Sequence, residues 1–423
     1  MAEQEGFIAE GYVHEAVPEE KLGSATEVFF IVTGTLCGLP AYALSAQIAG
    51  SLGFEDARTA FWSAGLICCV LAALTSYAGA RTRMNLAMMS DHAFGLAGGR
   101  VVKTLLAVCL LGWAAVILSV LGTTLGDAIQ RLYHVSVPSA LIETVAAVAI
   151  ATVTLRGVHG LESVGKVIAP VLAALLCWTL YRGCGDASVT AAQAAQAAAP
   201  ALGLGAAISA IVGGDIVGIL IQPDYSRFVR RPAHAGIASS LALGVAYPLV
   251  LTFTALPAAR CGAPNLIAVM IAAGVGIPAL ALLALGALID GGASLYSGSL
   301  SLTNELRRFR LPAVVVTAAG VGLVLALLHA EKHYLPFLSA LGVTLPPIGA
   351  ILVLHMLLVW RTQSPAERAS PVSLRLPAAV AWIGGTLVGY LGMNDHLHLT
   401  GIACLDSVAV ASVLWLIIRF AKQ

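Results

Sequence analysis

The chain has 423 residues, of which 59% are hydrophobic and 11% are charged. Soluble domains carry about 25% charged residues, so this composition excludes an ordinary soluble protein and predicts an all-α polytopic membrane protein. The formal net charge is +1, which gives no reason to expect a nucleic-acid partner.

Residues 1–24 form an acidic N-terminal tail with no basic segment ahead of an apolar core, so we do not expect a cleaved signal peptide. Twelve apolar runs follow, each long enough to cross the hydrocarbon core of a bilayer. The predicted spans are 25–50, 57–79, 101–127, 137–155, 163–182, 199–222, 234–257, 276–303, 311–329, 334–360, 375–393 and 399–420. A further apolar piece, 265–274, is too short to span and is expected to lie near the outer surface.

Lysine and arginine are distributed unequally over the loops between these spans. With the N-terminus inside, 18 of the 23 basic residues fall in inner loops and tails, and the other 5 fall in outer loops. Basic residues concentrate on the cytoplasmic side of membrane proteins. The bias and the even number of spans predict a multi-pass protein of the cytoplasmic (inner) membrane with both termini in the cytoplasm.

Three spans contain residues that a lipid-facing helix rarely carries. Gly38 and Pro40 interrupt the first, because proline cannot donate a helix hydrogen bond. In the sixth, the glycine pair 213–214 precedes Asp215 and is expected to let the backbone open beside that charge. The eighth carries Asp290, followed by two glycines and several serines. Acids inside a membrane usually face a cavity, a partner or a ligand.

The interrupted first and sixth spans are five spans apart. Two five-helix repeats of inverted topology would make them equivalent, and in transporters of that kind discontinuous helices meet at a midplane substrate site. The first repeat would cover residues 25–182 and the second 199–360. Residues 375–423 would then hold the last two helices and the C-terminal tail.

Trp113 lies about twelve residues inside the third span, which is too deep for the interfacial position that tryptophan usually takes. We expect it to offer a flat wall to a planar ligand. Asp406 in the last span has no evident partner and is expected to face an oligomer contact. The cysteines and histidines lack metal-ligand spacing, and nucleophile or phosphate-loop motifs are missing. The sequence therefore predicts neither a cofactor nor an enzyme.

Six segments of the chain resemble, in the same order, those of the nucleobase–cation symporters, in the cytosine permease branch that includes purine, allantoin, hydantoin and uracil transporters. Together they run over roughly four-fifths of the chain. They are GLPAYALSAQIAG in the first span, ARTRMNLAMMSDHAFG after the second, LGWAAV in the third, QPDYSRFVRRPAHA after the sixth, LYSGSLSLTNEL in the eighth and FLSALGVTLPPIGA in the tenth.

The resemblance implies twelve helices in the five-plus-five inverted-repeat fold of the LeuT type, with discontinuous helices 1 and 6. It also implies a substrate site between the first, third, sixth and eighth spans. Family members typically hold a flat heterocycle between an aromatic ring on the third span and one on the sixth. Trp113 matches the first ring, whereas the second falls at Asp215 or its neighbour Gly214. A carboxylate or bare backbone would replace one wall.

In sodium-coupled relatives, two neighbouring hydroxyl residues of the eighth span and backbone carbonyls of the first hold the ion. The matching positions here are Ile289 and Asp290 for the hydroxyls, and Gly38 with Ala41 or Tyr42 for the carbonyls. Asp290 could bind sodium through its oxygens, carry a proton, because burial favours a neutral carboxyl group, or be purely structural. The proton is the favoured alternative. The predicted cation-coupling residues are Asp290, Gly38, Ala41 and Gly286, and a sodium ion would lie at Gly38, Ala41 and Asp290.

The sequence thus predicts cation-coupled symport of a small planar nitrogen heterocycle, such as cytosine or a related nucleobase or pyrimidine, by alternating access. Trp113 would stack on the ring, and Asp215 would accept hydrogen bonds from its N–H or amine groups. The other predicted substrate contacts are Gly214, Gln47, Ser45, Tyr42, Gly291, Gly292 and Ser294. One alternative is a transporter of the same fold for an organic cation, an amine or a guanidinium compound, which the two carboxylates would suit. A channel or a membrane enzyme fits the sequence less well, and a monomer is compatible with it.

Overall fold

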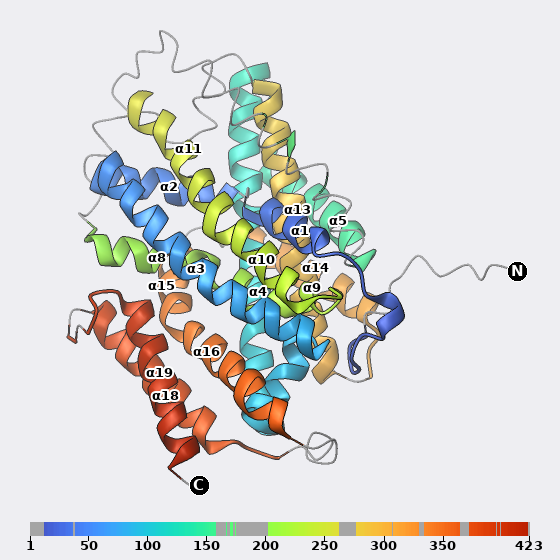
Figure 1. Cartoon of the computed structure of the whole chain (residues 1–423). Coiled ribbons are helices and arrows are strands. Elements are labelled where there is room, and N and C mark those ends of the chain that lie inside the picture. Colours follow the sequence, from blue (N-terminus) through green and yellow to red (C-terminus); the bar gives the residue numbers. More distant parts are fainter. Residues whose placement is uncertain are drawn as a thin grey trace, which may run out of the picture.

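A computed structural model describes residues 12–36, 39–157, 166, 170–171, 174, 202–261, 276–306, 308–329, 334–363, 372–394, 396–397 and 399–421. These residues are mainly helical (Figure 1), and within them the β structure is a single isolated bridge between Gly23 and Val229. The main helices are α1 Thr26–Leu36, α2 Leu39–Leu52, α3 Phe54–Thr82, α4 Leu86–Tyr133, α5 Ser139–Thr154, α8 Leu204–Leu220, α9 Gln222–Ser226, α10 Pro232–Leu241, the π-helix η2 Ala242–Ala246, α11 Tyr247–Cys261, α13 Gly276–Glu305, α14 Leu311–Leu327, α15 Tyr334–Thr344, α16 Pro346–Leu354, the π-helix η4 His355–Val359, α18 Leu376–Met393 and α19 Ala403–Phe420.

The predicted spans overlap with these helices wherever the structure describes them, but some bounds differ: α4 begins at Leu86 and α19 at Ala403, where the sequence predicted 101 and 399. Within the described residues, seven helices are long and apolar enough to cross a membrane, or eight if the bent pair α1 and α2 is one span. The predicted fifth span, 163–182, lies almost wholly outside the described residues, and the predicted surface helix, 265–274, lies wholly outside them. The count of twelve spans therefore stays a prediction.

The first span is broken, as predicted. Residues Thr26–Leu36 and Pro40–Leu52 form two helices that meet at 57°. Gly38, to which the break was assigned, lies outside the described residues, and Pro40 is in the first turn of α2. Proline is tolerated in a first turn, because the N–H groups there have no helical acceptor.

The sixth span is also interrupted, but the prediction that the glycine pair 213–214 opens it is wrong. Helix α8 runs unbroken through both glycines and ends at Leu220, one residue before the short helix α9. The interruption follows instead from Pro223, which has no N–H to donate to the carbonyl of Ile219. The Thr75 hydroxyl of α3 donates to that carbonyl at 3.0 Å. The Gln222 side chain donates to the carbonyl of Gly218 at 3.1 Å. Both carbonyls are thereby satisfied inside the membrane, where an unpaired one costs several kcal/mol.

Glycine pair 213–214 has a packing role in place of the predicted hinge. A Cβ atom at Gly213 would lie 3.0 Å from the Cα of Gly342 in α15. The two helices therefore approach backbone to backbone, as small residues allow in membrane proteins. An intact helix keeps its backbone hydrogen bonds, so tight packing is the cheaper use of these glycines in lipid.

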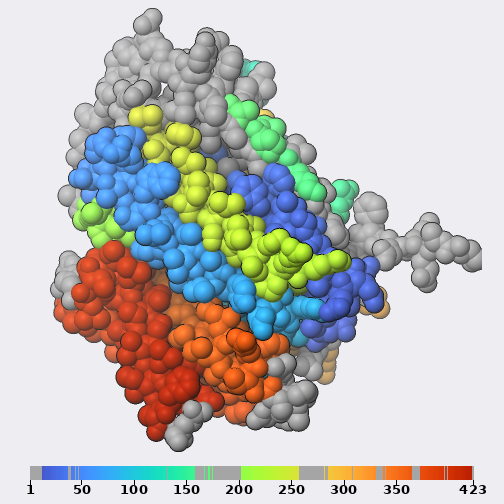
Figure 2. Space-filling model, in the orientation of Figure 1, coloured from blue at the N-terminus to red at the C-terminus, as the bar shows by residue number. Residues whose placement is uncertain are grey.

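The helices form a central bundle with a separate hairpin on one flank. Helix α13 packs against α4 and α5, and α3 packs against α8 and α10. Helices α18 and α19 pair with each other and lie against α15 and α16, visible as the red and orange flank in Figure 2. Gly95 kinks α4 with a φ of 79°, and its neighbours Leu96 and Ala97 donate to the carbonyls of Val372 and Ser373. The kink thereby joins residues 372–373, which precede α18, to the central bundle.

The prediction that Asp406 faces an oligomer contact is wrong. Its side chain is fully buried within the chain. One carboxylate oxygen accepts from the Thr400 hydroxyl at 2.6 Å and from the Thr400 N–H at 2.9 Å, and the other accepts from the Leu399 N–H at 3.2 Å. The acid therefore fixes the turn that leads into α19. Its partners are local groups of that turn, which the pattern of charges along a span cannot reveal.

Candidate substrate site

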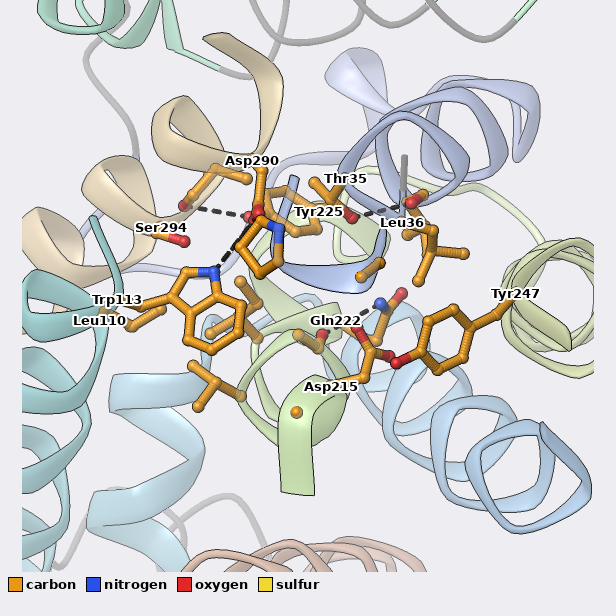
Figure 3. A pocket seen from close by; sticks show the side chains of 18 of the residues that line it. Thr35, Leu36, Leu110, Trp113, Asp215, Gln222, Tyr225, Tyr247, Asp290 and Ser294 are labelled. Carbon is orange, nitrogen blue, oxygen red and sulfur yellow. Dashed lines mark hydrogen bonds between the residues drawn. The ribbon is translucent and has the colours of Figure 1, made fainter. Parts of the chain in front are cut away.

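A pocket lies where the two broken spans meet α4, α11 and α13 (Figure 3). Its volume is about 50 Å³, which is smaller than the cavity of about 150 Å³ that is known to hold benzene. A flat ring therefore requires the pocket walls to move apart. The lining residues are Val32, Thr35, Leu36, Pro40, Ala41, Leu44, Leu110, Trp113, Gly214, Asp215, Val217, Gly218, Ile221, Gln222, Tyr225, Tyr247, Asp290, Ala293 and Ser294.

Trp113 and Asp290 meet across one side of this pocket. The indole Nε1–H of Trp113 on α4 points at the carboxyl group of Asp290 on α13, 3.2 Å from Oδ1 and 3.4 Å from Oδ2 (Figure 3). Each side chain is 9% exposed. The bond orients the tryptophan and gives Asp290 an N–H donor inside an apolar wall, where an unpaired polar group is costly.

Asp215 lies on the other side of the pocket, on α8. Its side chain and the Tyr247 hydroxyl point toward one another (Figure 3). The Asp215 Oδ2 atom is buried and accepts no hydrogen bond from the part of the chain that the structure describes. Nearby, Gln222 is held at both ends of its amide, since it donates to the Gly218 carbonyl and accepts from the Ser239 hydroxyl at 2.8 Å.

A network of buried polar side chains connects the pocket with the N-terminal segment. Tyr225 lines the pocket and donates to the carbonyl of Ala293 at 3.2 Å. Its ring stacks on Tyr296, with centroids 6.3 Å apart. The fully buried Arg227 donates to the Tyr296 hydroxyl at 3.3 Å and to the backbone carbonyl of Tyr12 at 2.9 Å. One wall of the pocket is therefore connected to the N-terminal segment.

Six residues predicted for the substrate or cation site line the pocket. They are Ala41, Trp113, Gly214, Asp215, Asp290 and Ser294. Because they come from four spans far apart in sequence, the structure brings together the first, third, sixth and eighth spans as the resemblance implied. What each residue binds stays a prediction.

The other predicted residues do not line the pocket. Ser45 is buried against α11, where its hydroxyl lies 2.7 Å from that of Thr254, and Gln47 is exposed. The contact with Thr254 directs the Ser45 hydroxyl toward α11, whereas Ala41 and Leu44 of the same helix line the pocket.

Three predicted glycines of α13, and Tyr42 of α2, also lie outside the pocket lining. Gly291 faces Ile150 of α5, and the carbonyl of Gly292 accepts from the Thr154 hydroxyl at 3.3 Å. Gly286 and Tyr42 are buried elsewhere in the bundle. Gly38, a predicted sodium ligand, lies outside the described residues, so of the predicted sodium ligands Ala41 and Asp290 are the two that the structure places at the pocket.

Sequence reasoning missed Gln222, Tyr225 and Tyr247. The first two are in the segment QPDYSRFVRR, whose polar residues followed an apolar span and looked like a loop. Pro223 starts a new short helix there and keeps both side chains inside. Tyr247 follows the π-helix η2 at the start of α11, and π-helical turns leave no clear signal in sequence.

Comparison with known proteins agrees with this architecture. The cytosine permease of Escherichia coli strain K12 is 23% identical over 403 residues, which cover 94% of this chain and 92% of that protein. The cytosine permease of Escherichia coli O157:H7 matches equally well.

Solved transporter structures share the fold. Mhp1, a nucleobase-cation-symport-1 family transporter, in a closed conformation with bromovinylhydantoin bound, superposes with a TM-score of 0.80 at 17% identity, covering 99% of this chain and 96% of Mhp1. MhsT in complex with L-phenylalanine gives a TM-score of 0.59 at 16% identity, over 95% and 99% of the two chains. These likenesses show that the chain has the LeuT-type transporter fold.

The family described as permease for cytosine/purines, uracil, thiamine, allantoin matches residues 16–414. The match covers nearly the whole chain, including every helix that lines the pocket. This multi-pass membrane protein is therefore a transporter and not an enzyme, and the chain belongs to the cytosine/purine permease family.

Proposed function

We propose that this protein is a cation-coupled symporter that takes up a small planar nitrogen heterocycle, such as cytosine, by alternating access. The observation that carries the proposal is the Trp113–Asp290 pair, which joins a flat aromatic surface and a buried acid in one pocket between broken spans. The aromatic face suits a planar ring. The acid suits the coupling cation. The small pocket volume fits a protein that must rearrange to admit its ligand.

Asp290 is the proposed coupling residue, with a proton favoured over sodium. Protonation removes a buried charge without requiring a set of oxygen ligands. Binding of the cation and of the heterocycle would each favour the same closed state, and their affinities would then be coupled.

Uptake of labelled cytosine into proteoliposomes tests this role. With Asp290→Asn, we expect uptake to lose its dependence on an imposed pH gradient, whereas counterflow exchange of substrate persists. A matched series with a sodium gradient separates the two ions. Gradient-driven uptake that is unchanged in Asp290→Asn would remove Asp290 from the coupling step.

We further propose that the protein lies in the cytoplasmic membrane with both termini inside. The 18 to 5 distribution of basic residues supports this orientation. A C-terminal fusion should be active with green fluorescent protein and inactive with alkaline phosphatase, because alkaline phosphatase folds only outside the cytoplasm. The opposite pattern would reverse the orientation.

A further inference from the structure

The pocket carries an excess of negative groups. Nineteen residues line it, and these include two carboxyl groups, Asp215 and Asp290, and no lysine, arginine or histidine among the residues that the structure describes. The two carboxyl groups line the same small pocket. Burying two negative charges without a partner is strongly unfavourable. Protons, a metal cation or hydrogen-bond donors of the ligand must therefore compensate them.

The two carboxyl groups differ in what already surrounds them. Asp290 has the indole N–H of Trp113 at 3.2 Å. Asp215 also lines the pocket, but its buried Oδ2 atom has no hydrogen-bond partner in the described part of the chain. Asp215 is therefore the carboxyl group with an unused acceptor, and a ligand in the pocket can supply the missing donor.

The chemistry of a carboxylate restricts which ligand edge fits. An ionised carboxylate only accepts hydrogen bonds, and its two oxygens match two parallel N–H donors. Such a pair occurs where a ring N–H and an amino group are attached to the same carbon, as in isocytosine, guanidines and protonated cytosine. A ring with oxygen in place of the amino group, such as uracil, sets a lone pair against the carboxylate. The oxygen on the ring and the carboxylate oxygen both carry negative charge, so they repel each other at hydrogen-bonding distance.

The residues beside Asp215 preserve this selectivity. Gln222 cannot rotate its amide freely to present either end, because it donates to the Gly218 carbonyl and accepts from Ser239. The Tyr247 hydroxyl and Asp215 point toward one another across the pocket lining (Figure 3). A ligand stacked on Trp113 would therefore meet Asp215 beside an amide that cannot turn to replace it.

We infer that Asp215 determines substrate specificity, by selecting a heterocycle with an N–H and an amino group on one carbon over the oxygen-substituted ring of the same size. The inference rests on the proposed function, since it places the ligand in this pocket. It assigns Asp215 to ligand choice and leaves Asp290 for the coupling cation.

Calorimetric titration of the purified full-length protein with isocytosine and with uracil tests the inference. We expect isocytosine to bind about 10- to 100-fold more tightly, the range for a hydrogen bond to a charged group. In Asp215→Asn the preference should disappear or reverse, because an amide offers one donor and one acceptor and fits the uracil edge. Asp215→Glu, which keeps the carboxylate, should retain part of the preference. Gel filtration and thermal unfolding establish that each variant is folded.

Equal affinities in the wild type, or an unchanged ratio in a folded Asp215→Asn, would overturn the inference and leave the proposed function standing. Benzamidine has two N–H donors on one carbon but is not a nucleobase, so it distinguishes a failure of the inference about Asp215 from a failure of the proposed function. If cytosine, isocytosine, uracil and hydantoin all fail to bind and benzamidine binds through Asp215, the proposed heterocycle substrate is wrong and the donor-pair rule survives. If benzamidine fails as well, both are rejected.

Discussion

At the scale of the residue, Trp113 combines two physical roles in one side chain. Its ring forms one wall of the pocket, and its N–H donates to Asp290 from 3.2 Å away. Phenylalanine preserves the aromatic face and removes the donor, whereas leucine removes both. The pair of substitutions therefore separates stacking on the ligand from support of the acid.

In Trp113→Phe, we expect ligand affinity to fall only a few-fold, with a larger change in the dependence of binding on pH or sodium. In Trp113→Leu, the lost aromatic contact, about 0.5–1.5 kcal/mol, should weaken binding by up to about a further tenfold. Titration calorimetry at two pH values, with and without sodium, measures both effects. Equal affinities for the Phe and Leu variants would mean that the ring does not stack on the ligand.

At the scale of the element, the break between α8 and α9 depends on a side chain from another helix. Pro223 leaves the Ile219 carbonyl without its usual partner, and Thr75 of α3 replaces that partner. Helix α3 thus helps to stabilise the interruption of the sixth span. This dependence explains why a proline can break the backbone in the membrane without an unpaired carbonyl.

Thr75→Val keeps the shape of the side chain and removes the hydroxyl. We expect it to lower the free energy of unfolding by about 1–3 kcal/mol, the cost of a buried polar group left unpaired. Thr317→Val is the matched control, because Thr317 is exposed on α14 and its hydroxyl bonds only within its own helix. Thermal unfolding in the same detergent compares them, and a Thr75→Val midpoint equal to that of the control would contradict the role assigned to Thr75.

At the scale of the whole molecule, the N-terminal segment ties together distant helices on one face. The Val13 carbonyl accepts from the Asn85 side chain at 2.9 Å and from the Asn304 side chain at 3.0 Å. It thereby joins the start of α4 to the end of α13. Arg83 donates to Glu19 at 2.7 Å and holds the pKa of that carboxyl below its usual value. That exposed contact is present at neutral pH and is lost as the pH falls through the lowered pKa.

Removal of residues 1–16 should loosen this face of the protein. Asn85, Asn304 and Arg227 would each lose a carbonyl acceptor. We expect faster amide hydrogen exchange at 85–94 and 299–306 and a lower unfolding temperature. Removal of residues 1–11 alone is the control, because it keeps Tyr12 and Val13. If both truncations exchange like the full chain, the N-terminal contacts do not stabilise this face.

The sequence by itself determined the features that depend on local composition. Long apolar runs, few charges and a helix-breaking proline specify membrane helices and a broken first span, because lipid requires each segment to satisfy its own backbone. Trp113, Asp215 and Asp290 could be selected because polar or aromatic groups deep in a span are rare. The ordered motifs carried the family assignment.

Only the tertiary structure decided which of these groups meet. The Trp113–Asp290 bond joins residues 177 positions apart, and the donors to the Asp406 carboxylate come from Leu399 and Thr400, just before α19. The glycine pair 213–214 packs instead of opening, because α15 presents Gly342 to it. Whether Ser45 or Ala41 faces the pocket depends on the rotation of α2 against α11. Contacts between helices are fixed by packing, and one chain segment cannot encode what its distant neighbour presents.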